Sequence, residues 1–172
     1  MLEQSFGYPQ IAAVLILVQR GLEEIYSARS NTKRLIAEGA QEVGRDYYPV
    51  VAITHLAWIA AIFMLIPVTA QIIWPLLLIY LLLQVVRYWV IATLGRYWTH
   101  RIITLKEAPV VRIGPYRWLR HPNYAVTIAE TFLLPLVFAD VAVAAIFGCV
   151  WSAVLYYKIL LEDGALKERR ED

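Results

Sequence analysis

The sequence predicts an all-α integral membrane protein with about five transmembrane helices, arranged as two helical hairpins and an N-terminal helix. Hydrophobic residues make up 60% of the 172 residues and charged residues only 17%, whereas roughly a quarter of a soluble domain is charged. The 40 residues between Asp46 and Arg87 contain no Asp, Glu, Lys or Arg, which is enough for two spans of about 20 residues each. This composition excludes a disordered or nucleic-acid-binding chain and argues against a soluble globule.

Four apolar segments are expected to span the membrane. Val50–Pro67 and Ile72–Leu94 should form one hairpin, and Pro122–Phe138 and Val141–Leu161 a second. Each segment should be helical, because backbone polar groups in lipid have to be satisfied within the segment.

The N-terminal segment Tyr8–Tyr26 allows two interpretations. Its last turns contain Arg20, Glu23 and Glu24, which are spaced so that they can pair on one helix face. The segment is therefore either a fifth span or a helix that lies in the membrane interface.

The distribution of Lys and Arg predicts the orientation. Most of the 16 basic residues fall within 29–45, 96–120 and 158–170. None lies in the N-terminal tail or in the turns at 67–71 and 139–140. The basic loops of membrane proteins face the cytoplasm, so the N-terminus should be outside and the C-terminus cytoplasmic. We expect one domain over residues 1–172, with its core at 96–166 and an N-terminal helix and loop at 1–49. Because the polar groups gather at one interface, an active site there could take a soluble cofactor and a lipid substrate.

The strongest local pattern is GPYRWLRHPNY, residues Gly114 to Tyr124. Pro122 is suited to the first position of a helix, whose next free N–H groups can bind an anion. Tyr116 and Tyr124 offer aromatic faces to a cationic group. The alternative is an aromatic belt at the membrane surface with snorkelling arginines.

A second group, Lys158, Glu162 and Asp163, lies in YYKILLEDGAL. Acidic residues oppose the dipole of a helix C-terminus, which suggests a functional role. The alternatives are a Lys158–Glu162 pair on one face or a solvated helix end.

Several single residues have structural alternatives. Glu130 lies within a span, where a carboxylate is costly unless it is paired, so it either pairs with Arg87 or orients a substrate. His55 is expected to be a hydrogen-bonded packing residue, and the single Cys149 a small buried hydrophobe. No spacing of His, Cys, Asp or Glu resembles a metal site.

The motif GPYRWLRHPNY, then a hairpin, then Lys158-Ile-Leu-Leu-Glu162-Asp163-x-x-Leu166, resembles the isoprenylcysteine carboxyl methyltransferase family. Members share an RHPxY motif and a later Arg-x-x-x-Glu-Glu-x-x-Leu motif. The resemblance covers about Arg96 to Leu166. The segment EGAQEVGRDYYPVVAITH looks like bacterial members that act on long-chain phenolic or pyrone lipids. This resemblance implies an integral protein of a bacterial inner (plasma) membrane.

The resemblance implies binding of S-adenosyl-L-methionine on the cytoplasmic side. The cofactor residues that it implies are Arg101, Ala108, Pro109, Val110, Val111, Tyr116, His121, Pro122, Asn123, Tyr124 and Glu162. Lys158 stands where the family has a substrate-side Arg, so the charge is kept but the bidentate fork is lost. The sequence given also ends before the family's Tyr-rich C-terminal ending, so we expect another segment to cover the cofactor.

The expected function is O-methyl transfer to a lipophilic acceptor from the bilayer, a phenolic or enolic lipid or a prenylcysteine-like carboxylate. A carboxylate needs no base, whereas a phenol with a pKa near 10 would use His121 or Glu130, and Lys158 would stabilise the anion. One alternative is an NADPH-dependent membrane reductase of the sterol-reductase type. Another is a non-enzymatic scaffold whose basic loops bind membrane lipids.

Overall fold

The computed structural model describes residues 6–106 and 108–171, without the side chains of residue 27 and residues 168–171. Two of the basic residues predicted to be cytoplasmic, Arg169 and Arg170, therefore have side chains outside the described part. The helices and strands are, in chain order, α1 (Tyr8–Glu23), a π-helical turn (Glu24–Ala28), α2 (Arg29–Ala37), β1 (Gln41–Val43), α3 (Tyr48–Leu65), α4 (Trp74–Leu94), β2 (Ile102–Thr104), α5 (Pro122–Val137) and α6 (Val141–Glu171). Short 3₁₀ turns occupy Arg45–Tyr47, Gly95–Tyr97 and Gly114–Arg117.

Proline sets the start of four of these helices. Pro9, Pro49, Pro75 and Pro122 occupy the first or second position of α1, α3, α4 and α5. The N–H groups of a first helical turn have no intrahelical partner, so a residue without an N–H fits there at no cost. The four prolines therefore mark where these four helices begin.

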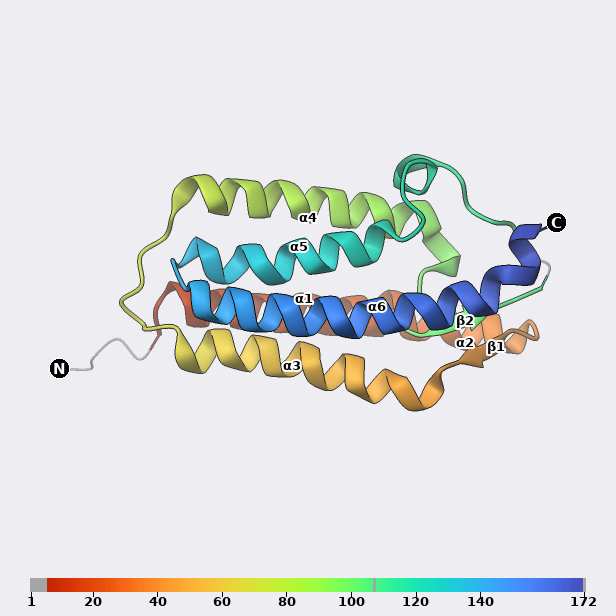
Figure 1. Ribbon diagram of the computed structural model, residues 1–172, viewed down its shortest axis with the longest axis horizontal. Helices are drawn as coiled ribbons and strands as arrows, with labels where there is room; N and C mark the ends of the chain where they lie inside the picture. The colour runs from red at the N-terminus through yellow and green to blue at the C-terminus, as the bar shows by residue number, and fades with distance from the viewer. Residues whose placement is uncertain (1–5, 107, 172) are drawn as a thin grey trace.

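The long helices run alongside one another as a bundle (Figure 1). The most extensive contacts join α5 to α6, α4 to α5, α1 to α3 and α3 to α6. The predicted second hairpin is thus α5 and α6. The predicted first hairpin is wrong, because α3 and α4 lie on opposite sides of the bundle and pack against other helices instead of each other (Figure 1).

Three helical segments of the described residues are long and apolar enough to cross a membrane: Arg45–Leu65, Trp74–Tyr97 and Val141–Lys167. The outer face of α4 shows why they require lipid, since Leu78, Leu82 and Val85 are 60%, 58% and 67% exposed. A continuous exposed apolar face of this kind is unstable in water. The protein is therefore an integral membrane protein.

The inside of the bundle is packed with large apolar side chains. Trp58 and Ile62 of α3 and Val137 of α5 are fully buried in one cluster that also includes α1 residues. At Gly148 of α6 an added Cβ would lie 2.2 Å from the Phe132 ring of α5, so only glycine permits this close approach. Cys149, expected to be buried, is exposed on α6.

A short antiparallel sheet joins the two polar loops. Gln41 pairs with Thr104 and Val43 with Ile102. The all-α prediction did not include this sheet, because three-residue strands are too short to give a periodic pattern. The sheet holds the loop after α2 against the loop after α4, next to the end of α6.

Candidate active site

A cavity of about 170 Å³ lies at the end of the bundle where β2, the start of α5 and the last turns of α6 meet. Of the residues predicted to bind a cofactor, the cavity is lined by Arg101, Ala108, Pro109, Val110, Val111, Tyr116, His121, Asn123, Tyr124 and Glu162. Pro122 does not line the cavity; it is buried as the first residue of α5. Neither Lys158 nor Glu130 is among the lining residues.

The two sequence motifs meet through Tyr124 and Glu162. The Tyr124 hydroxyl donates a hydrogen bond of 2.7 Å to Glu162 Oε2. His121 lies beside them, with its Nε2 3.0 Å from Asp163 Oδ1 and its Nδ1 3.5 Å from Glu162 Oε2. Its ring also stacks on the ring of Tyr124, with 5.5 Å between centroids. The start of α5 and the end of α6 are thus joined by side-chain contacts at the cavity.

The two carboxylates control the protonation of His121. Burial lowers the pKa of its imidazole, but hydrogen bonds to Glu162 and Asp163 and their negative charges outweigh burial, so the pKa lies above its usual value. Burial and the charge of Glu162 also raise the pKa of Tyr116. The site therefore favours a charged His121 and a neutral Tyr116.

Lys158 lies next to the ring of Tyr124. Its Nζ donates a hydrogen bond of 2.7 Å to the carbonyl oxygen of His100 and lies 5.1 Å from the centre of the Tyr124 ring. The side chain is buried and lines a second, small cavity beside β1 and the start of α3. The pairing with Glu162 that its spacing allowed is replaced by this carbonyl contact.

Two residues of this network, Glu24 and His100, were not singled out as site residues from the sequence. His100 Nδ1 lies 2.6 Å from Glu24 Oε2, and Glu24 is the first residue of the π-helical turn that joins α1 to α2. Such turns occur frequently at functional sites. A chain of contacts thus runs from the N-terminal helix through His100 to Lys158.

Arg101 and its neighbour Ile102 line both cavities. Its Nη1 lies 2.6 Å from Glu42 Oε1 of β1, and its guanidinium lies 4.4 Å from the centre of the Tyr48 ring. These contacts fix Arg101 across the sheet.

Two buried polar atoms of the cavity lining have no hydrogen-bond partner among the described residues: Asn123 Oδ1 and Trp98 Nε1. A buried polar group without a partner costs about 1–3 kcal/mol. One acceptor and one donor of the cavity wall are thus free to bind a ligand.

Glu130 belongs to a separate ionic cluster in the bundle. Its Oε2 lies 2.7 Å from Arg20 Nη2 and 3.3 Å from Arg87 Nη1, which confirms the predicted pair with Arg87. Arg87 also lies 2.6 Å from Glu23, and Gln84 donates to Glu130 Oε1. Two arginines and two glutamates therefore balance one another, and none of them lines the cavity.

His55 packs between two tryptophans, 5.5 Å from Trp58 and 5.6 Å from Trp151 between ring centroids. Its Nε2 lacks the expected hydrogen bond within the described part of the chain. The described residues also contain no group of three or more His, Cys, Asp or Glu that could hold a metal ion.

Parts of the chain are similar to known proteins. Residues 76–168 match the model of the isoprenylcysteine carboxyl methyltransferase (ICMT) family. An uncharacterised protein of Bacillus subtilis (strain 168), YpbQ, is 32% identical over 159 residues, which are 90% of this chain and 95% of YpbQ. No solved structure matches the chain. The matched segment includes both motifs and most of the cavity wall, and the chain belongs to the isoprenylcysteine carboxyl methyltransferase family.

Proposed function

We propose that this membrane methyltransferase uses S-adenosyl-L-methionine to methylate an oxygen of a lipophilic acceptor at the cytoplasmic face of the membrane. The Tyr124–Glu162 hydrogen bond carries the proposal, because it brings the two family motifs together at the wall of one cavity. The proposal includes a single domain over residues 1–172, five spans and an outside N-terminus. The charged groups at the cavity end of the bundle support this orientation.

The residues of the cavity fit such a cofactor. Its cationic centre suits the aromatic faces of Tyr116 and Tyr124, and its amino group suits the carboxylate of Glu162, which lies in the same wall. Its carboxylate suits the N-terminus of α5. Asn123 Oδ1 and Trp98 Nε1 offer an acceptor and a donor that have no hydrogen-bond partner in the described part of the chain.

When bound, the cofactor supplies an electrophilic methyl group on a sulfonium. The protein then has to hold the acceptor oxygen in line and exclude water, and positioning of this kind contributes about 7–11 kcal/mol. Tyr124 and Glu162 hold each other in place for this task. Lys158 does not line this cavity, but, buried against the Tyr124 ring, it places one positive charge beside the site. A single ammonium acts as a point charge.

The ionic contacts of the two candidate bases, His121 and Glu130, favour an acceptor that is already ionised. His121 contacts two carboxylates that stabilise its protonated form, so it is poorly suited to accept a further proton. Glu130 is paired with two arginines away from the cavity. We therefore favour a carboxylate or an acidic enol over a simple phenol as the methyl acceptor.

The test is thermal unfolding of the detergent-purified protein with S-adenosylhomocysteine, compared with NADPH. A ligand at 100 times its Kd stabilises a protein by about 2.7 kcal/mol, which gives a clear rise in Tm. Tyr124→Phe and Glu162→Gln should reduce the rise, whereas Arg45→Gln, at a position 80% exposed, should keep it. A rise with NADPH alone would support the reductase, and no rise with either would reject both enzymes.

If the cofactor binds, transfer of a labelled methyl group to a lipid extract should identify the acceptor. An alkali-labile product would indicate a methyl ester from a carboxylate, and an alkali-stable product an ether of an enol or a phenol. Acid hydrolyses an enol ether but not a phenolic methyl ether, so a product stable to both alkali and acid would contradict the preference for an ionised carboxylate or enol.

A further inference from the structure

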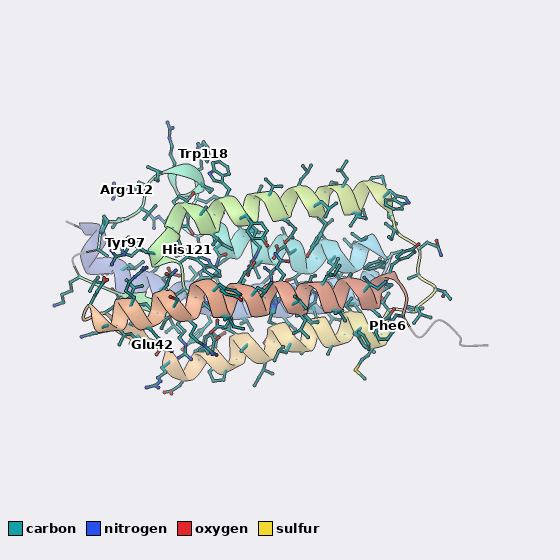
Figure 2. All side chains as sticks on the ribbon, turned by 180° about the vertical axis from the view of Figure 1, so that it is seen from behind. Phe6, Glu42, Tyr97, Arg112, Trp118 and His121 are labelled. Atoms are coloured by element: carbon teal, nitrogen blue, oxygen red, sulfur yellow. The ribbon has the colours of Figure 1, made fainter. Side chains whose placement is uncertain are left out.

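The loop before α5 places three arginines and three large apolar side chains on one exposed surface. Ile113, Trp118 and Leu119 are 67%, 68% and 54% exposed. Arg112, Arg117 and Arg120 are exposed between and beside them. We call residues 112–120 the arginine loop. Figure 2 shows Arg112 and Trp118 on it, above the end of α4 and outside the bundle.

The three arginines form no ion pair within the part of the chain that the structure describes. This distinguishes them from Arg96 and Arg101, which pair with Glu38 and Glu42. An exposed guanidinium binds phosphate with a planar pair of donors. The loop therefore offers positive charge to an anion from outside the chain.

The loop is fixed at the depth of the membrane surface. Gly114, at a φ of 53°, lies so close to α4 that an added Cβ would be 2.8 Å from Thr93 Oγ1. The Trp118 ring meets the Trp89 ring edge to face, with 6.1 Å between centroids. Thr93 and Trp89 both belong to the span Trp74–Tyr97, so Trp118 lies where the apolar span ends, the depth that tryptophan prefers.

Apolar side chains among arginines at this depth match the boundary between acyl chains and phosphates. A soluble acidic protein would offer charge to the arginines, but its approach to Trp118 would be limited by the bilayer around α4. The occupant that fits both features is an anionic phospholipid of the surrounding membrane.

The same loop forms part of the cavity wall. Tyr116 lies inside the loop and lines the cavity together with Arg120, and Val111 and His121 flank the loop on either side. We propose that anionic phospholipid headgroups bind the arginine loop through Arg112 and Arg117 and thereby hold the cavity in its ligand-binding form. The inference rests on the proposed function for the identity of the ligand, but not for the lipid contact.

The test measures the Kd of S-adenosylhomocysteine for the full chain in nanodiscs of phosphatidylcholine alone and of phosphatidylcholine with phosphatidylglycerol. Coupling between two sites changes affinity typically about 5-fold or more, so we expect at least about fivefold tighter binding with phosphatidylglycerol. The double variant Arg112→Gln/Arg117→Gln should lose this gain. The control Lys33→Gln/Arg45→Gln removes two exposed basic residues elsewhere and should keep it.

Equal Kd values in both lipids, or an equal loss in the control variant, would overturn the inference. Glycerol phosphate added to phosphatidylcholine discs separates a free anion from a lipid, and full recovery by glycerol phosphate would also overturn it. If S-adenosylhomocysteine binds in neither lipid, the proposed function fails instead. Quenching of Trp118 fluorescence by brominated phosphatidylglycerol, taken as the difference from Trp118→Phe, then tests the lipid contact alone.

Discussion

At the scale of single residues, His121 links the electrostatics of the site to pH. Its contacts with Glu162 and Asp163 join α5 to α6, and they are strongest when the imidazole is protonated. Stability of the ligand-free protein should therefore depend on the protonation of this one residue.

The expected pH dependence follows from the raised pKa. In the unfolded chain a histidine has a pKa of about 6.5, and in the folded protein the pKa of His121 is higher. The folded state therefore binds the proton more tightly, so the stabilisation is fully present below about pH 6.5 and is lost as pH rises through the folded pKa. The Tm difference between wild type and His121→Gln should shrink across this window. A difference that is constant from acidic to alkaline pH would contradict it.

The resemblance to a known family implied most of the residues that line the cavity, but not all of their partners. Tyr124 and Glu162 were predicted because both belong to recognisable motifs, and the structure places them 2.7 Å apart. Glu24 and His100 are 76 positions apart in the chain and belong to neither motif. The carbonyl that accepts from Lys158 could not be predicted either, because every residue carries a carbonyl.

At the scale of helices, the pairing of α5 and α6 positions the site. Tyr124 belongs to the first turn of α5 and Glu162 to the late part of α6, so the distance between these helices sets the geometry of the cavity. Close approach depends on Gly148, as at other helix contacts in membranes.

Gly148→Ala should therefore destabilise the protein by about 1–3 kcal/mol, the usual cost of overpacking, and weaken binding of S-adenosylhomocysteine. The matched control is Gly164→Ala in the same helix, where nothing lies within 4 Å of the added Cβ. This control should be neutral or stabilising by up to about 1 kcal/mol, because alanine has the higher helix propensity. Chemical denaturation in mild detergent measures both. Equal effects of the two substitutions would show that the close approach does not matter.

The bounds of the helices were largely predictable from the sequence, whereas their packing partners were predictable only in part. The length of the apolar runs placed α3 and α4 within a few residues of their observed bounds. Their packing partners depend on side chains from the whole chain, and the connection between them is long enough to place them on opposite sides of the bundle. The Ala139-Asp140 turn, in contrast, is too short for anything but a hairpin.

At the scale of the whole molecule, the ionic cluster joins α1, α4 and α5 inside the bundle. Removing one partner from a buried ion pair typically costs about 3–5 kcal/mol, because it leaves an unbalanced charge. Glu130→Gln should show this loss. Arg87→Met/Glu130→Gln, which restores neutrality, should lose less than the sum of its two single variants.

A variant of the ionic cluster should lose stability without losing ligand binding. Because Glu130 does not line the cavity, the fraction of Glu130→Gln that folds should keep its affinity for S-adenosylhomocysteine. The measurement is calorimetric titration at a temperature where the variant is folded. Loss of binding by a well-folded Glu130→Gln protein would instead show that Glu130 contributes to ligand binding.

The proposed five-span topology predicts which loops are accessible from outside the cell. In a Cys149→Ser background, Phe6→Cys and Thr69→Cys should react with a membrane-impermeant maleimide on intact cells. Lys33→Cys should react only after lysis. Phe6 packs against Phe63 near the end of α3, so both positions should be at the same membrane face. Reaction of Phe6→Cys only after lysis, while Thr69→Cys reacts on intact cells, would contradict a spanning α1, and reaction of both only after lysis would contradict the orientation.

The ionic cluster also has a consequence for how the chain enters the bilayer during synthesis. In the proposed five-span topology α1 can be inserted alone, because Arg20 and Glu23 neutralise each other within it. Insertion of α4 then adds the positive charge of Arg87, at a cost of up to about 2.5–3.5 kcal/mol, the value for an arginine at mid-membrane, and only α5 brings Glu130 to balance it. We therefore expect the insertion machinery to hold α4 until α5 has been made and to release the two helices together.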